Sequence, residues 1–191
     1  MEIDARDGRS LYRTLAGAVV PRPIGWIATR GPDGDNLAPY SFFNVATPKP
    51  PTLAFSAGDT REGLKDTARN AVETGAFTHN VVMADLAAAM NETAATGAID
   101  EFDRAKLTAV DARTVEAPRV GESPVSFECA VVETVDFGAS TLVLGQVQYV
   151  HIADQVTTDG KLDTDKLDAL GRMTGNGYAY TRDRFELERP E

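Results

Sequence analysis

The stretch PRPIGWIATRGPDGDNLAPYSFFN, residues 21–44, decides the predicted fold. Residues 24–29 form a β-type run around one tryptophan and two isoleucines. The turn signal GPDG follows at residues 31–34, and residues 37–43 supply a partner strand, so the stretch predicts a β-hairpin. Because proline has no N–H to give to a neighbouring strand, we expect Pro39 at a sheet edge or a bulge.

Further β-type runs extend this pattern along the chain. They cover residues 52–56, 77–82, 125–135 and 141–152, with a turn at 137–140 between the last two. Prolines at positions 48, 50 and 51 interrupt the chain before the first of these runs. Many strands without regular β-α-β alternation predict a mainly β fold with inserted helices, built as a closed or partly closed antiparallel barrel.

Helices are expected in a smaller part of the chain. The clearest one starts near Asp59, where Glu62 would complete a capping box, and ends at Gly75. A short helix is predicted at residues 84–90, a polar excursion at 91–107, and one or two helical turns at 163–170.

Composition limits the possible functions. The 191 residues suit one domain, residues 1–191, and a net charge of −10 argues against a nucleic-acid surface. No apolar run reaches the roughly 20 residues of a membrane span, and the N-terminus lacks a signal-peptide core, so we expect a soluble cytoplasmic protein without a membrane partner. Five lysines stand against fourteen arginines, which fits either salt adaptation or an ordinary acidic cytosolic surface.

Several kinds of catalytic site are missing from the sequence. There is no Walker A, H-E-x-x-H, G-x-G-x-x-G or G-x-S-x-G pattern, and no carboxylate pair is marked as catalytic. The single cysteine, Cys129, excludes an intrachain disulfide and a thiolate zinc site, and it is expected to be a packing residue. His79 and His151 are likewise expected to be structural.

Two segments could hold a ligand. In the predicted helix Arg61, Lys65 and Arg69 recur every four residues, so they would share one face near a helix N-terminus, as a phosphate site requires. Residues 36–44 mix aromatic and short polar side chains, which suits a flat amphipathic ring. The alternatives are a plain amphipathic helix with solvated cations and aromatic residues that simply fill the core.

Taken together, the segments resemble the flavin reductase-like family, the FMN-binding split barrels that include flavoredoxin and NAD(P)H:flavin oxidoreductases. The resemblance runs from about Pro21 to Pro190. Its pieces are PRPIGWIAT (21–29), NLAPYSFFN (36–44), KDTARN (65–70), DEF (100–102), ESPVSFEC (122–129) and GQV (145–147).

This resemblance implies an antiparallel FMN-binding split β-barrel that acts as a homodimer, with flavin near the subunit interface. It also implies the residues that bind the cofactor: Lys65, Asp66 and Thr67 for the phosphate with Arg61 and Asn70 as neighbours, Ala38, Tyr40, Ser41 and Asn44 for the isoalloxazine, and Thr29, Ser56, Arg22 and Tyr178 as further contacts.

The implied activity is that of an NAD(P)H-dependent flavin reductase, in which hydride passes from nicotinamide to flavin N5 and no side-chain acid or base is needed. FAD remains possible in place of FMN, and free flavin or an electron-transfer protein could be the next partner. Two alternatives stay open: an FMN electron carrier of flavoredoxin type without nicotinamide activity, and a non-catalytic flavin-binding module.

Overall fold

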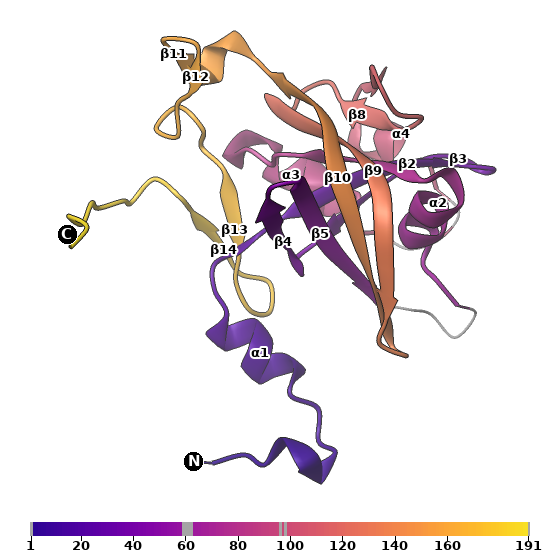
Figure 1. Cartoon of the computed structure of the whole chain (residues 1–191), viewed down its shortest axis with the longest axis vertical. Helices are drawn as coiled ribbons and strands as arrows, with labels where there is room; N and C mark the ends of the chain where they lie inside the picture. Colours follow the sequence, from indigo (N-terminus) through magenta and orange to yellow (C-terminus); the bar gives the residue numbers. More distant parts are fainter. Residues whose placement is uncertain (1, 59–62, 96, 98, 191) are drawn as a thin grey trace.

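The computed structural model describes residues 2–58, 63–95, 97 and 99–190. Its centre is a seven-stranded antiparallel sheet in the order β3-β2-β6-β9-β10-β5-β4 (Figure 1). The strands are β2 (Gly25–Gly31), β3 (Gly34–Tyr40), β4 (Phe43–Pro48), β5 (Pro51–Gly58), β6 (Ala76–Asn80), β9 (Val125–Asp136) and β10 (Ser140–Ile152). The prediction of a mainly β, antiparallel fold with inserted helices is confirmed.

The predicted hairpin is formed by β2 and β3, which pair from Gly25 with Tyr40 to Gly31 with Gly34. Because β3 is an edge strand, Pro39 loses no hydrogen bond to a second neighbour, as expected. The partner strand is shorter than predicted: β3 ends at Tyr40, and a new edge strand, β4, begins at Phe43. Pairing with β5 extends β4 to Pro48, where the sequence suggested only a break.

The sheet curls around one apolar core, so that its two edges approach each other. Tyr40 from β3 and Phe55 from β5 lie in the same buried cluster, with ring centroids 5.2 Å apart. At the other edge, the Ser56 N–H donates to the Phe42 carbonyl oxygen at 2.8 Å, which continues the β4–β5 pairing by one residue. Curling of this kind reduces the exposed strand edges.

The outer face of β2 is covered by the excursion that follows β6. Its elements are η2 (Ala84–Leu86), α3 (Ala87–Glu92), α4 (Glu101–Ala105), β7 (Ala109–Asp111) and β8 (Pro118–Val120). Trp26, whose side chain is fully buried, packs in this second cluster and donates from Nε1 to Thr93 Oγ1 at 2.9 Å. Both faces of β2 are therefore buried, which explains its nearly continuous apolar sequence.

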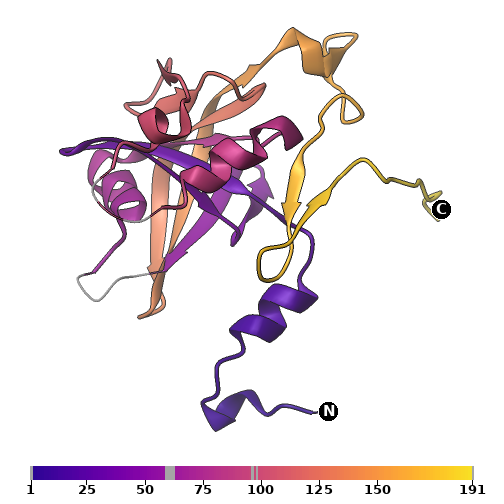
Figure 2. The ribbon, with the colours of Figure 1, turned by 180° about the vertical axis from the view of Figure 1, so that it is seen from behind.

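The chain ends form a smaller layer beside the sheet. A three-stranded sheet joins β1 (Arg22–Pro23), β13 (Leu170–Arg172) and β14 (Tyr178–Tyr180). The helix α1 (Tyr12–Ala18), preceded by η1 (Ala5–Asp7), projects from the body, as does the C-terminal tail (Figures 1 and 2). Residues 163–170 contain no helix, contrary to prediction; β13 begins at Leu170, after η3 (Asp154–Val156), β11 (Thr157–Thr158) and β12 (Lys161–Leu162).

The start of the main helix was predicted wrongly. Helix α2 covers Asp66–Thr74, and Lys65 at its N-cap has an extended backbone. Gly63, with φ of 117°, and Leu64 lie outside the helix. The predicted capping pair Asp59 and Glu62 lies outside the described residues. The helix ends at Gly75 in the left-handed conformation, as predicted.

None of the described helices is both long and apolar enough to cross a membrane.

Candidate functional site

A cleft opens between strand β3, the N-terminus of α2 and residues 93–95, 97 and 99–101. It consists of two adjoining lobes of about 390 Å³ and about 520 Å³. Both lobes are lined by Asn36, Asp66, Arg69, Gly97 and Glu101, so they form one continuous cleft. The smaller one, here called the strand lobe, is also lined by Ala38, Pro39, Tyr40, Leu64, Lys65, Thr67 and residues 93–95. The larger one, the helix lobe, extends over Asp33, Gly34, Asp35, Asn70, Ile99 and Asp100.

The start of α2 forms one wall of the strand lobe. The first N–H groups of an α-helix have no partner within the helix and carry partial positive charge. Lys65 stands at this end with an exposed side chain, and it forms no ion pair with any described residue. The lobe thus has a free cation next to free N–H groups, a combination that suits a phosphate.

The opposite wall is strand β3, which is tied to its neighbours by a polar network. Thr67 Oγ1 donates to Asn36 Oδ1 at 2.6 Å, linking α2 to the strand. Asn36 Nδ2 and the Leu37 N–H both donate to Glu101 Oε2 at 3.3 Å, linking the strand to α4. Burial raises the pKa of Glu101, while these hydrogen bonds oppose that rise.

The ring of Tyr40 forms an aromatic floor of the strand lobe, and its phenol hydroxyl adds a polar group there. Burial raises the pKa of its phenol to about 12, although a hydrogen bond with Thr67 acts in the opposite direction. The phenol is therefore neutral at physiological pH and can act as a hydrogen-bond donor.

The prediction that Lys65 and Arg69 share one face of the helix is wrong, because Lys65 precedes α2 and Arg69 lies on it. Arg61, the third predicted member of that face, lies outside the described residues. Arg69 pairs with Asp66 at 2.8 Å and lies 3.8 Å from Asp33. Among the described residues, the cations that line the cleft are therefore Lys65, at the N-cap of α2, and Arg69, within the helix.

Of the predicted site residues, the structure brings six to the cleft. Ala38, Tyr40, Lys65, Asp66 and Thr67 line the strand lobe, and Asn70 lines the helix lobe. Thr29 lies directly beneath, where its Oγ1 accepts a hydrogen bond from Asn70 Nδ2 at 3.5 Å.

The other predicted residues that the structure describes lie elsewhere in the chain. Asn44 is exposed on β4 and accepts from the Val45 N–H at 2.8 Å; Ser41 and Ser56 lie near the same edge. The Arg22 guanidinium is buried and donates to the carbonyl oxygens of Ala16, Val19 and Met173, which joins α1 to the small sheet. Tyr178, on β14, is covered by the Arg172 guanidinium 4.5 Å from its ring centroid.

Some cleft residues were not among the predicted site residues. Asn36 and Glu101 both occur in the segments that suggested the family, but nothing in their local sequence marks them as cleft residues. Asp100 caps α4 by accepting from the Asp103 N–H at 2.9 Å. An aspartate at this position is typical of a helix N-cap, so the sequence did contain a signal for α4, the helix that places Glu101 against β3.

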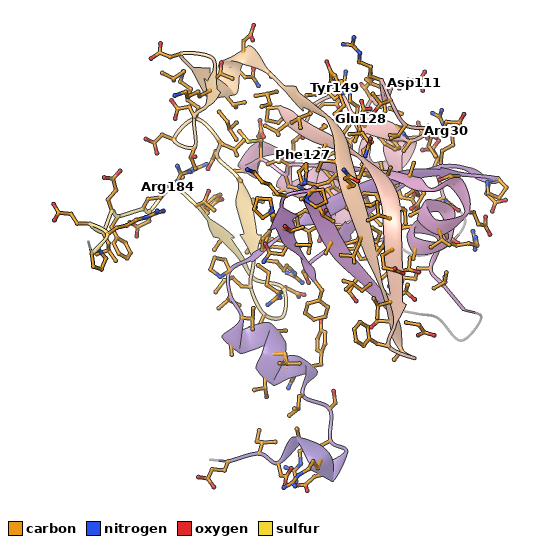
Figure 3. All side chains as sticks on the ribbon, viewed as in Figure 1. Arg30, Asp111, Phe127, Glu128, Tyr149 and Arg184 are labelled. Atoms are coloured by element: carbon orange, nitrogen blue, oxygen red, sulfur yellow. The ribbon has the colours of Figure 1, made fainter. Side chains whose placement is uncertain are left out.

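A second cluster of titratable groups lies away from the cleft, on β9 and β10 (Figure 3). Glu128 is fully buried and accepts hydrogen bonds from the Arg113 N–H, the Thr114 N–H and the Thr114 hydroxyl at 2.5–2.6 Å. His151 Nε2 lies 2.6 Å from the same carboxylate. Burial alone would raise the pKa of Glu128, but these hydrogen bonds outweigh burial and lower the pKa to about 2.

The other predicted structural residues are buried. His79 lies between the rings of Phe43 and Phe127, with centroid distances of 4.2 and 5.7 Å, and burial lowers its pKa to about 3. Cys129 is in the core, where burial raises its pKa to about 12, so the prediction of a packing cysteine is confirmed.

The sequence was compared with protein families and with known proteins. Residues 17–185 match the family model of the flavin reductase like domain. A protein of Deinococcus radiodurans is 40% identical over 190 residues, which cover 93% of this chain and 84% of that protein.

Solved structures extend the likeness to three dimensions. Nitrilotriacetate monooxygenase component B from Bacillus cereus is 30% identical, with a TM-score of 0.92 and 98% of each chain covered. A split-barrel protein of Shewanella frigidimarina, described as a flavin reductase, has a TM-score of 0.80 at 22% identity over the full length of both chains. These similarities confirm the predicted split barrel.

Proposed function

The chain belongs to the flavin reductase-like family, and on that premise we propose that it binds FMN and catalyses hydride transfer from NAD(P)H to the flavin. The observation that carries the proposal is the strand lobe. It combines a free cation and free helix N–H groups at one end with an aromatic floor and a strand edge at the other. A flavin mononucleotide has the matching parts, a phosphate and a flat amphipathic ring.

In this proposal Lys65 and the first N–H groups of α2, that of Thr67 among them, hold the phosphate. Ala38 and Pro39 on β3 leave room for a ring to lie along the strand, and Tyr40 donates a hydrogen bond from below. The bound flavin supplies the hydride-accepting chemistry, and the residues around it bind, orient and exclude water. The lining contains no residue that must act as a proton donor or acceptor for this reaction.

We also propose a cytoplasmic homodimer that passes reduced flavin, or its electrons, to a partner. Five apolar side chains are exposed in the single chain: those of Tyr12 and Leu15 on α1, of Val19 directly after it, and of Phe42 and Val45. A second copy would bury them. The similar Bacillus cereus protein is a component of a monooxygenase, which supports a role as electron supplier to another protein.

The first experiment is the visible spectrum of the purified protein, recorded before and after anaerobic addition of NADH or NADPH. A flavin spectrum that bleaches supports the proposal. A flavin spectrum that stays oxidised with both donors contradicts the reductase activity and favours an electron carrier. A colourless protein that takes up no FMN contradicts flavin binding altogether, and sedimentation of the same sample measures the oligomeric state.

The phosphate assignment has its own test. Lys65→Ala should weaken FMN binding about tenfold, because it removes one charge-assisted contact, and should leave riboflavin binding nearly unchanged. The matched control is Lys49→Ala, at the turn between β4 and β5. Equal weakening of FMN and riboflavin would contradict the assignment.

A further inference from the structure

The C-terminal tail, here residues 182–190, is fastened to the body at its start and then leaves it. Arg182 forms an ion pair with Asp168, and its Nε donates to Asp168 Oδ1 at 2.7 Å. Arg184 forms an ion pair with Asp165 at 2.9 Å and also donates to backbone carbonyl oxygens of the same segment (Figure 3). These two arginines fix the direction in which the rest of the tail extends.

Beyond this anchor the tail presents two apolar side chains to solvent. Phe185 is 84% exposed and Leu187 is 81% exposed, more than any other large apolar side chain in the described part of the chain. Their spacing of two residues is that of one face of an extended strand, and Glu186 and Glu188 alternate with them. A contact that covered this face would remove a large apolar area from water.

A second exposed apolar surface surrounds helix α1. This α1 surface consists of Tyr12, Leu15, Val19, Phe42 and Val45. The Tyr12 ring packs edge-on against the Phe42 ring, with centroids 6.1 Å apart, so the helix and the start of β4 form one continuous surface. Arg13, on the same helix, is exposed and forms no ion pair with any described residue.

The tail does not cover the α1 surface of its own chain. Helix α1 and the tail leave the body in different directions in both views, and the arginine anchor holds the tail there (Figures 1 and 2). The α1 surface can therefore receive a tail only from another molecule.

Charge favours a second copy of this chain as that molecule. Two copies of net charge −10 repel each other, but residues 182–190 contain three arginines and three carboxylates, so the tail itself has no net charge. Within the described part of the chain, Glu186 and Glu188 form no ion pair, and Arg13 is a cation that they can approach on another copy. Both the apolar and the charged groups of the tail thus have counterparts on the α1 surface.

We propose that in the homodimer the tail of each copy packs on the α1 surface of the other copy. Phe185 and Leu187 make the apolar contact, and the glutamates between and after them face Arg13. A two-fold axis makes the contact reciprocal, so each dimer contains it twice. The inference rests on the homodimer of the proposed function and needs no flavin for its test.

The first test is the dimer dissociation constant, measured by sedimentation. Phe185→Ser combined with Leu187→Ser should weaken the dimer at least tenfold, because the apolar contact is lost at both ends of the dimer. A chain that ends at Arg184 keeps both anchoring arginines and should show the same loss. The control is Phe137→Ser, in the turn between β9 and β10, where the side chain is 67% exposed; it should leave the constant unchanged.

The outcomes separate this inference from the homodimer itself. A dimeric wild type whose dissociation constant is unchanged in the serine variant and in the shortened chain overturns the tail contact alone. Equal weakening by Phe137→Ser also overturns it. A wild type that stays monomeric overturns the homodimer and the tail contact together.

Cross-linking tests which surfaces meet. The native Cys129 is buried, so an introduced surface cysteine is the reactive one. Leu15→Cys and Leu187→Cys, mixed and allowed to exchange subunits, should give more covalent dimer with a short bifunctional maleimide than either variant alone. Phe137→Cys in place of Leu187→Cys should not. A mixed yield no higher than that of the separate variants overturns the inference.

A charge exchange tests the contact of the glutamates with Arg13. Arg13→Glu should weaken the dimer about threefold or more, and adding Glu186→Arg or Glu188→Arg should restore it. Glu133→Arg, at an exposed position on β9, returns the net charge to the same value and should not restore the dimer. Restoration by neither tail variant, or equal restoration by Glu133→Arg, overturns the proposed pairing.

Discussion

Replacing Glu128 by glutamine should destabilise the fold at neutral pH far more than at pH 3. The carboxylate is fully buried and accepts from two backbone N–H groups, the Thr114 hydroxyl and His151. Glutamine has the same shape but only one acceptor oxygen, and its NH₂ group would face donors. The segment around residues 113–114 would then lose its attachment to β9.

The magnitude follows from the pKa of Glu128. A shift from the ordinary 4.5 to about 2 corresponds to about 3 kcal/mol in favour of the folded state when the group is ionised. Because the folded pKa is the lower one, this stabilisation is fully present above about pH 5 and is lost as the pH falls toward 2. At pH 3 only about 1 kcal/mol should remain.

Urea unfolding of the wild type and Glu128→Gln at both pH values measures this difference. The control is Glu133→Gln, an exposed position on the same strand, which should change stability by less than about 0.5 kcal/mol. If Glu128→Gln lowers the free energy of unfolding equally at neutral pH and at pH 3, packing and not the charge is responsible. No deficit at neutral pH would refute the reasoning altogether.

Three further predictions concern the core and the cleft. Gly145→Ala should lower the free energy of unfolding by about 1–3 kcal/mol, measured by thermal or urea unfolding, because its Cβ would come within 2.3 Å of the Phe77 ring. The control is Gly58→Ala, whose Cβ would have no described atom other than those of its chain neighbours within 4 Å. Cys129, buried and with its pKa raised to about 12, should react with a thiol reagent only after unfolding, and rapid native labelling would contradict this. Because the pKa of Tyr40 is about 12, its phenol stays protonated between about pH 6 and about pH 10 and should cause no change in flavin affinity over this range. The pH profile of flavin affinity should therefore be the same for Tyr40→Phe as for the wild type.

Local signals in the sequence predicted the hairpin and the long strands well. Turn chemistry at residues 31–34 and 137–140 fixes which strands are neighbours, and such pairing needs no distant contact. The start of α2 was predicted wrongly because capping signals near Asp59 compete with Gly63, whose positive φ lies just before the helix. Strand β4 was missed because Pro48 at its end, with Pro50 and Pro51 close behind, indicates a break, whereas the strand is held by its pairing with β5.

The candidate site was only partly accessible from the sequence. Lys65, Asp66 and Thr67 were predicted through the family resemblance, and they line the cleft. Asn36 and Glu101 are far apart in the sequence and meet only because α4 folds back on β3. Contacts of that kind depend on how the excursion packs, which periodicity and capping do not determine.

The buried Trp26 can serve as an intrinsic fluorescence probe of the candidate site. It is the only tryptophan, so the intrinsic emission comes from a single point in the structure. The indole N–H donates a hydrogen bond to Thr93, which lines the strand lobe. The tryptophan emission should therefore respond when the segment that carries Thr93 moves. A bound flavin would accept excitation energy from this indole, and the quenching would follow cofactor release in real time without any attached dye.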